Sequence, residues 1–259
     1  MELAIFVQTR SSMVLGSRAG GIFGCRHLCA RSQGSIQRLR NNRGLRAFIT
    51  ALVLWLGASS AVAATPAGPA SALKTPISKT VAQFAAWVVA SHDADGLPFL
   101  IVDKQNARVL IFDPEGHLGD ASPALLGLAR GDDSVPGIGQ RKLSSIKPSE
   151  RTTPAGRFAA ELGNDFGAKD ILWVDYENAI SLHRVVPGTV KDRRQQRLAS
   201  PSALDNRITF GCINVPAQFF DMSVRPIFMA GKGIVYILPE VRSLKSVFPR
   251  YGEDSSAFP

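Results

Sequence analysis

Short apolar runs separated by polar turns fill the chain from Pro98 onward. Runs of this kind, rich in valine, isoleucine and phenylalanine, are typical of β-strands. We therefore expect strands at 99–102, 108–112, 157–162, 171–174, 179–183 and 234–238, with another inside 121–128. Few helical patterns lie between them. The sequence predicts a mainly β fold, a sandwich or barrel with a few short helices.

One helical pattern precedes these strands. Thr75 and Pro76 can begin a helix, because proline suits the first helical position. Apolar residues then recur at helical spacing, at Ile77, Val81, Phe84, Ala85 and Val88. The pattern ends near Ser91, before the turn-forming residues 93–96. We expect this N-terminal helix to pack on the domain that follows it.

Residues 208–215, which read Ile-Thr-Phe-Gly-Cys-Ile-Asn-Val, combine a buried strand pattern with a single thiol. The apolar residues around Cys212 predict a strand that enters a tight turn at Gly211. Pro216 and the residues that follow predict a short helix near 217–222. A thiol placed where a strand meets a helix lies beside free backbone N–H groups, which together with the helix dipole favour a thiolate.

The N-terminal residues change the meaning of the net charge, which is +9. Residues 1–63 hold eight arginines, no lysine and one acid, which leaves 22 basic and 20 acidic residues, a net charge of +2, for the rest of the chain. Nucleic-acid binding requires a basic face on the folded domain. The charge therefore argues against a nucleic-acid partner.

The same residues have the order of a secretory signal peptide. Arg43 and Arg46 precede the apolar residues 47–57, and small residues follow at 61–64. We expect translation to begin near residue 39 and the protein to be exported to the periplasm or cell envelope. The apolar run is short for a membrane span. The alternative to a cleaved signal peptide is an uncleaved N-terminal anchor, which is the one membrane attachment that we consider. The predicted divisions are a leader at 1–63, a linker and helix at 64–97, a main domain at 98–239 and a C-terminal tail at 240–259.

Export makes the cysteines informative. Cys25 and Cys29 flank His27 in the leader, but this spacing is incomplete for a metal site and we expect none. Cys212 then has no partner for an internal disulfide. Because buried cysteine is often inert, its thiol is either a core group or a reactive one.

His183 is the best candidate to activate the thiol. The alternation in 180–184 predicts a strand with His183 on the side away from the core. A thiol has an unperturbed pKa of about 8.5 and needs help to react at neutral pH. An imidazole within hydrogen-bond reach can hold the thiolate and then protonate a leaving amine. This chemistry needs no metal and no organic cofactor.

Two further features complete the predicted chemistry. The backbone N–H groups of Phe210, Gly211 and Cys212 could form an oxyanion hole, in which each donor is worth roughly 10²–10³ in rate. His92 and His117 compete with His183 for the role of base. Both lie near predicted turns, where a solvated surface histidine is common.

Three segments resemble a known family when they are taken together and in order. Residues 99–112 resemble its first two strands, and residues 153–158 resemble its Thr-Pro-x-Gly-x-Phe signature. Residues 209–214 resemble its block of serine or threonine, any residue, glycine and cysteine, and His183 matches the motif histidine. On these matches, residues 98–239 are similar to the L,D-transpeptidase catalytic domain of the YkuD type.

The resemblance implies an activity and a set of roles. Members of the family attack the peptide stem of peptidoglycan, expel its terminal D-alanine and pass the acyl group to an amine of a second stem. Carried over by position, Cys212 is the nucleophile, His183 is the general base and acid, and Thr209 and Asn214 contact the substrate. Peptidoglycan stem peptides are then the expected partner.

The sequence also departs from the family pattern. Arg184 replaces the glycine that commonly follows the histidine, and Asn214 replaces a common arginine. A substrate carboxylate therefore needs another partner, for which Arg207 and Arg184 are candidates, although both are as readily explained as surface arginines.

Two long polar segments are less specific. Residues 131–148 form a predicted loop that is a lid, a substrate wall or a plain connector. The polar segment 185–206 contains Arg193, Arg194 and Arg197, which are typical of a solvated loop but could face an anionic substrate.

Two other functions stay open. The same acyl-enzyme could be resolved by water, which would make the protein a peptidase or amidase. Alternatively, the altered positions Arg184 and Asn214 could mark a catalytically silent wall-binding protein, since a fold does not guarantee a function.

Overall fold

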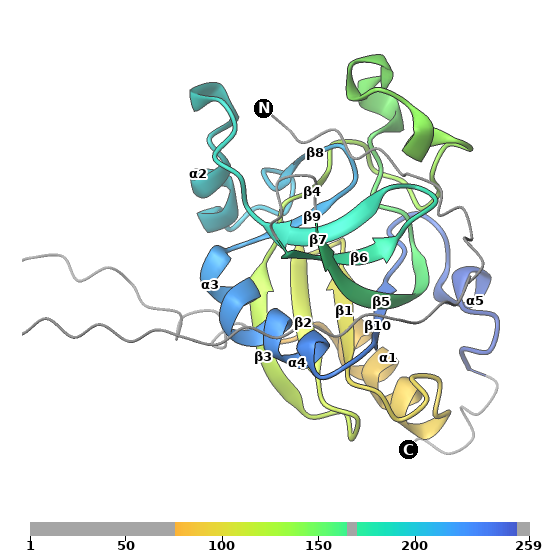
Figure 1. The fold of residues 1–259 in the computed structure, drawn as a ribbon. Helices are drawn as coiled ribbons and strands as arrows, with labels where there is room; N and C mark the ends of the chain where they lie inside the picture. The colour runs from red at the N-terminus through yellow and green to blue at the C-terminus, as the bar shows by residue number, and fades with distance from the viewer. Residues whose placement is uncertain (1–75, 165–169, 253–259) are drawn as a thin grey trace, which may run out of the picture. The chain divides into compact units, whose positions relative to one another are not determined.

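The computed structural model describes residues 76–164 and 170–252 (Figure 1). The predicted leader, with Cys25, His27 and Cys29, lies outside these residues, as does the predicted linker before residue 76. The predicted domain boundaries and export therefore stay predictions. Within the described residues, no helix is long and apolar enough to cross a membrane.

Ten strands and five α-helices form the described part of the chain. The strands are β1 (Phe99–Asp103), β2 (Arg108–Phe112), β3 (Leu118–Pro123), β4 (Leu126–Gly127), β5 (Gly156–Asn164), β6 (Asp170–Asp175), β7 (Ile180–Arg184), β8 (Arg207–Thr209), β9 (Ile213–Val215) and β10 (Gly233–Ile237). The helices are α1 (Lys79–Ala90), α2 (Arg194–Ala199), α3 (Ala217–Phe219), α4 (Arg225–Met229) and α5 (Leu244–Val247).

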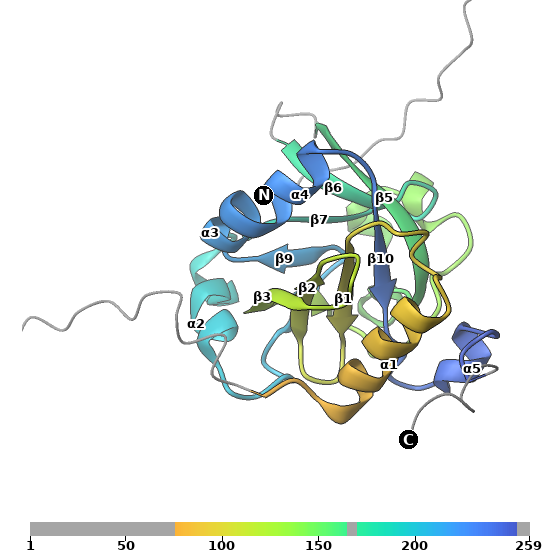
Figure 2. The same ribbon diagram turned by 90° about the horizontal axis from the view of Figure 1, so that it is seen from below.

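Eight of the strands form one sheet in the order β3-β2-β1-β10-β5-β6-β7-β9, and β4 and β8 form a separate parallel pair. The pairs β1–β10 and β7–β9 are parallel, and the other pairs are antiparallel. The sheet curls until it is nearly closed (Figures 1 and 2). The predicted mainly β fold is confirmed.

Strand β1 shows why its residues form a continuous apolar run. Phe99 and Ile101 point into one hydrophobic core, and Leu100 and Val102 point into the other. All four side chains are fully buried. A strand that is covered on both faces is apolar at every position rather than at alternate ones.

Helix α1 covers one face of this central part of the sheet (Figure 2). Its Phe84 and Trp87 pack in the same core as Phe99. The helix begins at Lys79 because the Ser78 hydroxyl accepts a hydrogen bond from the Val81 N–H at 3.2 Å. This serine cap, rather than the predicted start at Pro76, sets its first residue.

The opposite core lies between the central strands and the strands β6, β7 and β9, with α3 and α4 at its edge. A single turn of π-helix, Phe220–Val224, joins α3 to α4. The predicted helix near 217–222 therefore exists and is longer than expected. It begins after β9, so Cys212 lies between two strands and not where a strand meets a helix. The expected help from the helix dipole thus has no support in the structure.

The two long polar segments have local structure that the sequence did not predict. Residues 131–148 contain the short 3-10 turns Ile138–Gln140 and Leu143–Ser145. Helix α2 lies within the polar segment 185–206. The strand expected inside 121–128 is divided between β3 and β4.

Candidate active site

The parallel pairing of β7 with β9 brings the predicted catalytic residues together. His183 lies beside Asn214 in the register of the two strands, and Leu182 lies beside Ile213. One step earlier, Ser181 lies beside Cys212, with 3.6 Å between the Ser181 Oγ and the Cys212 Sγ. Since side chains alternate along a strand, Ser181 and His183 share one face of β7, away from the core residue Leu182.

Cys212 is half-buried, and two oxygen atoms flank its sulfur. The Ser181 hydroxyl can donate to Sγ, and the Ala179 carbonyl oxygen lies 3.7 Å from Sγ, where it can accept from the thiol. The hydroxyl favours the thiolate because it donates, whereas the carbonyl favours the protonated thiol. Ser181 is fully buried, and sequence reasoning missed it because an isolated serine in a strand gives no signal.

The segment that presents the thiol, residues 209–212, is a tight turn that we call the cysteine turn. The Thr209 hydroxyl accepts from the Gly211 N–H at 3.1 Å and donates to the Cys212 carbonyl at 2.7 Å. Gly211 has φ of +135°, and a Cβ there would lie 2.8 Å from both the Thr152 carbonyl oxygen and an Ile180 methyl carbon. Only glycine fits this backbone, but the close approach is to Thr152 within the protein.

These contacts bear on two predicted roles. Thr209 is fully buried, and its described hydrogen bonds hold the cysteine turn, so its predicted contact with substrate has no support in these bonds. The Gly211 N–H is engaged by Thr209, so it would have to leave that bond to serve an oxyanion. Phe210 and Cys212 supply the other two N–H groups of the predicted hole.

Thr153, from the predicted Thr-Pro-x-Gly-x-Phe signature, holds the cysteine turn through a hydrogen bond to its backbone. Its hydroxyl accepts from the Gly127 N–H at 2.9 Å and donates to the Gly211 carbonyl at 2.8 Å. The side chain is fully buried. This single hydroxyl therefore ties residues 153–158 and β4 to the turn that carries Cys212.

A chain of hydrogen bonds determines which ring nitrogen of His183 carries the proton. Arg194 Nη1 lies 3.1 Å from Asn214 Oδ1, and Asn214 Nδ2 lies 2.9 Å from His183 Nε2. A guanidinium can only donate, so it must face the amide oxygen, and the amide N–H₂ must face the imidazole. His183 Nε2 is then the acceptor, and Nδ1–H donates to the Arg184 carbonyl, 2.8 Å away. The nitrogen that can take a proton is therefore Nε2, which must first leave its hydrogen bond with Asn214.

Asn214 and Arg194 thus have roles that the sequence did not assign. Asn214 is fully buried and orients the histidine. Arg194 is 6% exposed and lies one residue after the exposed Arg193. In the sequence, Arg194 was only one of several arginines in a polar segment. Its burial could not be predicted because helix α2 was not predicted.

The other two histidines lie elsewhere on the surface. His92 is exposed in the turn that follows α1, and His117 is exposed beside Asp113. These positions agree with the surface explanation given for both.

Arg184 and Arg207, the predicted partners of a substrate carboxylate, both face acidic residues of the protein. Arg184 pairs with Asp170 and Asp221 and stacks on the Phe220 ring at 4.3 Å. Arg207 is buried and pairs with Glu240 at 2.5 Å. A substrate carboxylate would have to compete with these ion pairs.

Arg207 belongs to a buried group that we call the ionic cluster, made of Lys104, Asp132, Arg207 and Glu240. Lys104 Nζ donates to Asp132 at 2.7 Å and to the Thr153 carbonyl at 2.9 Å. The side chains of Lys104, Asp132 and Glu240 are at most 1% exposed. Two cations and two anions match, so the cluster carries no net charge.

The cluster changes the titration of its members. Burial would raise the pKa of Asp132, but hydrogen bonds from Lys104 and from the backbone of residues 240–242 outweigh it and lower this pKa to about 2. Burial lowers the pKa of Lys104 below its usual value, against the opposing effect of Asp132. Because Lys104 also bonds Thr153, the cluster supports the residue that holds the cysteine turn.

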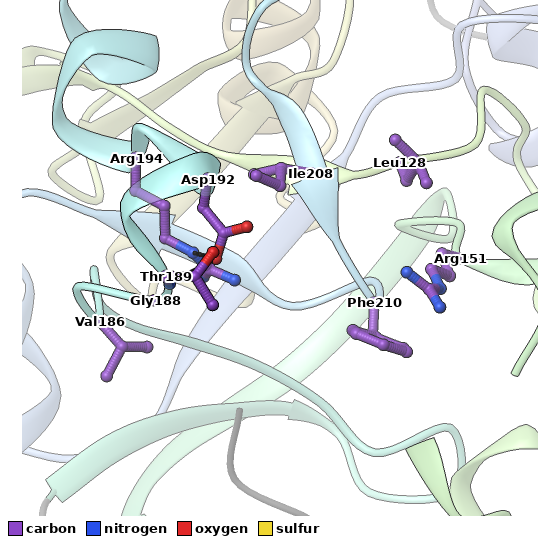
Figure 3. Close-up of a pocket in the computed structure, with 9 residues that line it drawn as sticks. All are labelled: Leu128, Arg151, Val186, Gly188, Thr189, Asp192, Arg194, Ile208 and Phe210. Atoms are coloured by element: carbon purple, nitrogen blue, oxygen red, sulfur yellow. Dashed lines mark hydrogen bonds and ion pairs between the residues drawn. The ribbon is translucent and has the colours of Figure 1, made fainter. Parts of the chain in front are cut away.

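A cavity of about 310 Å³ lies beside the site (Figure 3). Arg194, Asp192 and Thr189 form one side, and Phe210 and Arg151 form the other. Phe210 precedes Cys212 by two residues, and Arg194 bonds Asn214. The cavity wall is therefore linked to Cys212 through the chain and to Asn214 through a hydrogen bond, although neither residue lines the cavity.

The site as a whole is a cysteine–histidine site on a mainly β scaffold. No protein-family model and no curated protein matches the chain. Among solved structures, it is similar to an L,D-transpeptidase from Xylanimonas cellulosilytica, with 13% identity, 54% of this chain and 60% of that chain covered, and a TM-score of 0.32. It is also similar to the L,D-transpeptidase LdtMt1 in complex with imipenem, with 13% identity, 54% and 58% coverage and a TM-score of 0.30. The chain thus spans less than two thirds of the length of either structure.

Proposed function

We propose that this protein is an exported cysteine L,D-transpeptidase that acts on the peptide stem of peptidoglycan. One observation carries the proposal: the pairing of β7 with β9 puts Ser181 and His183 beside Cys212 and Asn214. A nucleophile, a base and a group that orients the base are the three parts that covalent catalysis by cysteine requires. The family motifs in the sequence supply the substrate class.

The reaction follows from these groups. His183 Nε2 leaves its hydrogen bond with Asn214 and accepts the thiol proton, and the Cys212 thiolate adds to the carbonyl carbon before the terminal D-alanine. The tetrahedral intermediate breaks its C–N bond, the imidazolium protonates the departing amine, and a thioester remains. An amine of a second stem then attacks the thioester, gives its proton to His183 and expels the thiolate. Bonds, charges and protons balance without a metal or an organic cofactor.

Water is the competing acceptor. If water attacks the thioester, the product is a shortened stem, and the protein is a hydrolase. Both reactions would use the same residues of the site. The products therefore tell whether an amine or water is the acceptor.

The test is to mix the purified protein with a disaccharide-tetrapeptide and to follow the products by mass spectrometry. We expect a cross-linked dimer that lacks one D-alanine. It should be absent for Cys212→Ala and strongly reduced for His183→Ala, whereas His117→Ala, which changes an exposed histidine, should behave as the wild type. Shortened stem without dimer would support the hydrolase. Neither product, with no adduct on Cys212, would support the silent wall-binding alternative.

A further inference from the structure

The cavity beside the site offers two fixed guanidinium groups to a ligand (Figure 3). Arg194 is held by Asn214, with Nη1 at 3.1 Å from Oδ1, and by Asp192, with Nε at 3.7 Å from Oδ2. Arg151 lies over the Phe210 ring at 3.8 Å and donates to the Ile146 carbonyl. A guanidinium that is already fixed loses little freedom when it binds an anion.

The charges that line the cavity favour an anion. Arg151 and Arg194 supply two positive charges, and Asp192 supplies one negative charge. The Asp192 carboxylate is itself held by the Thr189 N–H at 2.8 Å. The net charge of the lining is therefore positive.

The position of Arg194 connects this anion site to the chemistry. Its partner Asn214 bonds His183, the proposed base, and lies two residues after Cys212. A group bound at Arg194 would therefore lie close to the bond that is broken. In a tetrapeptide stem, the carboxylate of the terminal D-alanine lies two bonds beyond the nitrogen of that bond.

We propose that this cavity binds the C-terminal carboxylate of the acyl-donor peptide at Arg194. The inference rests on the proposed function and assigns the carboxylate partner to Arg194 in place of Arg184 and Arg207. Those two arginines hold their acids closely, Arg184 at 2.9 Å from Asp170 and Arg207 at 2.5 Å from Glu240. The ion pair of Arg194 with Asp192 is longer, at 3.7 Å. Arg151 adds to the positive potential from the opposite side of the cavity.

The test compares a tetrapeptide stem that has a free C-terminal carboxylate with the same stem carrying a C-terminal amide. Calorimetry measures the binding of each peptide to Cys212→Ala, which cannot turn it over. The further variants in this background are Arg194→Gln, Arg194→Lys and, as the control, Arg193→Gln. The control removes the same charge from the neighbouring exposed residue.

We expect the Cys212→Ala parent to bind the free acid about tenfold more tightly than the amide, because a hydrogen bond between charged groups is lost with the amide. Arg194→Gln should bind both peptides equally, Arg194→Lys should keep part of the preference, and Arg193→Gln should keep all of it. Circular dichroism would show that each variant is folded.

Two results would overturn the inference. A parent that binds acid and amide equally, while the wild type still turns over the free acid, would remove this inference alone. The same holds if Arg194→Gln is folded and keeps the full preference. If the wild type neither binds nor turns over the free acid, the proposed function fails, and the inference fails with it.

Discussion

Strand β8 separates two regions that contain arginine, and the two regions use it differently. Behind the strand, Arg207 lies in the ionic cluster, in which two cations meet two anions, and it lines a cavity of about 340 Å³ together with Lys104, Arg130 and Glu240. In front of the strand, Ile208 and Phe210 line the cavity that Arg151 and Arg194 also line. Since side chains alternate along a strand, Arg207 lines one cavity and its neighbour Ile208 lines the other.

The surroundings of an arginine determine its role. A buried arginine whose charge is matched by a buried acid stabilises the fold, because breaking the pair leaves a charge without compensation. Arg194 instead bonds the amide of Asn214 and lies 3.7 Å from Asp192 on its cavity wall, where we propose that a ligand carboxylate binds. The two regions are linked, since Lys104 bonds the Thr153 carbonyl and the Thr153 hydroxyl bonds Gly211.

The largest expected effect is in the ionic cluster. Asp132→Asn removes the partner of a fully buried lysine, so we expect the free energy of unfolding to fall by about 3–5 kcal/mol. The matched control is Asp133→Asn, because Asp133 is exposed and pairs with Arg242 at the surface. That change should cost less than about 1 kcal/mol. Urea unfolding measures both, and equal losses would show that the cluster is not a special region.

The cluster should also have a pH signature. The pKa of Asp132 is lower in the folded protein than in the unfolded chain, so its contribution to stability is complete above about pH 5 and is lost as the pH falls toward 2. Between these limits we expect wild type to lose about 2 kcal/mol more than Asp132→Asn. Thermal unfolding across this range tests the difference, and parallel curves for the two proteins would contradict it.

Thr153→Val tests the link between the two regions. Valine has nearly the same shape but leaves the Gly127 N–H and the Gly211 carbonyl without their hydroxyl partner, so we expect a loss of about 1–3 kcal/mol in stability. Because the cysteine turn loses its support, kcat should fall while KM changes little. Thr153→Ser keeps the hydroxyl and should restore most of both. A Thr153→Val protein with unchanged kcat would separate the cluster from the site.

The smallest effect is expected at Ser181. Ser181→Ala removes the donor beside the Cys212 sulfur, and we expect the rate of alkylation by iodoacetamide at neutral pH to fall about fivefold, equivalent to about 1 kcal/mol for one hydrogen bond. Ser122→Ala is the control, since Ser122 is also buried but lies in β3 and bonds the Pro123 carbonyl. If both variants react as the wild type does, Ser181 does not assist the thiolate.

The sequence predicted most strands and the residues that meet at β7 and β9, because apolar alternation and short motifs are local signals. It did not predict the ionic cluster. Lys104, Asp132 and Glu240 are far apart in the chain, and each has the polarity of a surface residue. It also left Arg194 among loop arginines, because burial by a short helix is decided by tertiary packing rather than by helix propensity.

The sheet order was equally hidden from the sequence. Strand β10 lies between β1 and β5, pairing in parallel with one and antiparallel with the other. Each strand has a clear apolar pattern, but such a pattern indicates a buried strand without indicating its neighbours.

This central position of β10 has a consequence for the order in which the protein can fold. Phe99 pairs with Ile234, so the middle of the sheet joins the beginning and the end of the described chain. During synthesis, β1 and β5 emerge long before β10 and have edges without a partner until it arrives. Pairings so distant in sequence are slow to form. The nascent chain therefore cannot complete its sheet until Ile237 has been made, and until then those edges favour aggregation.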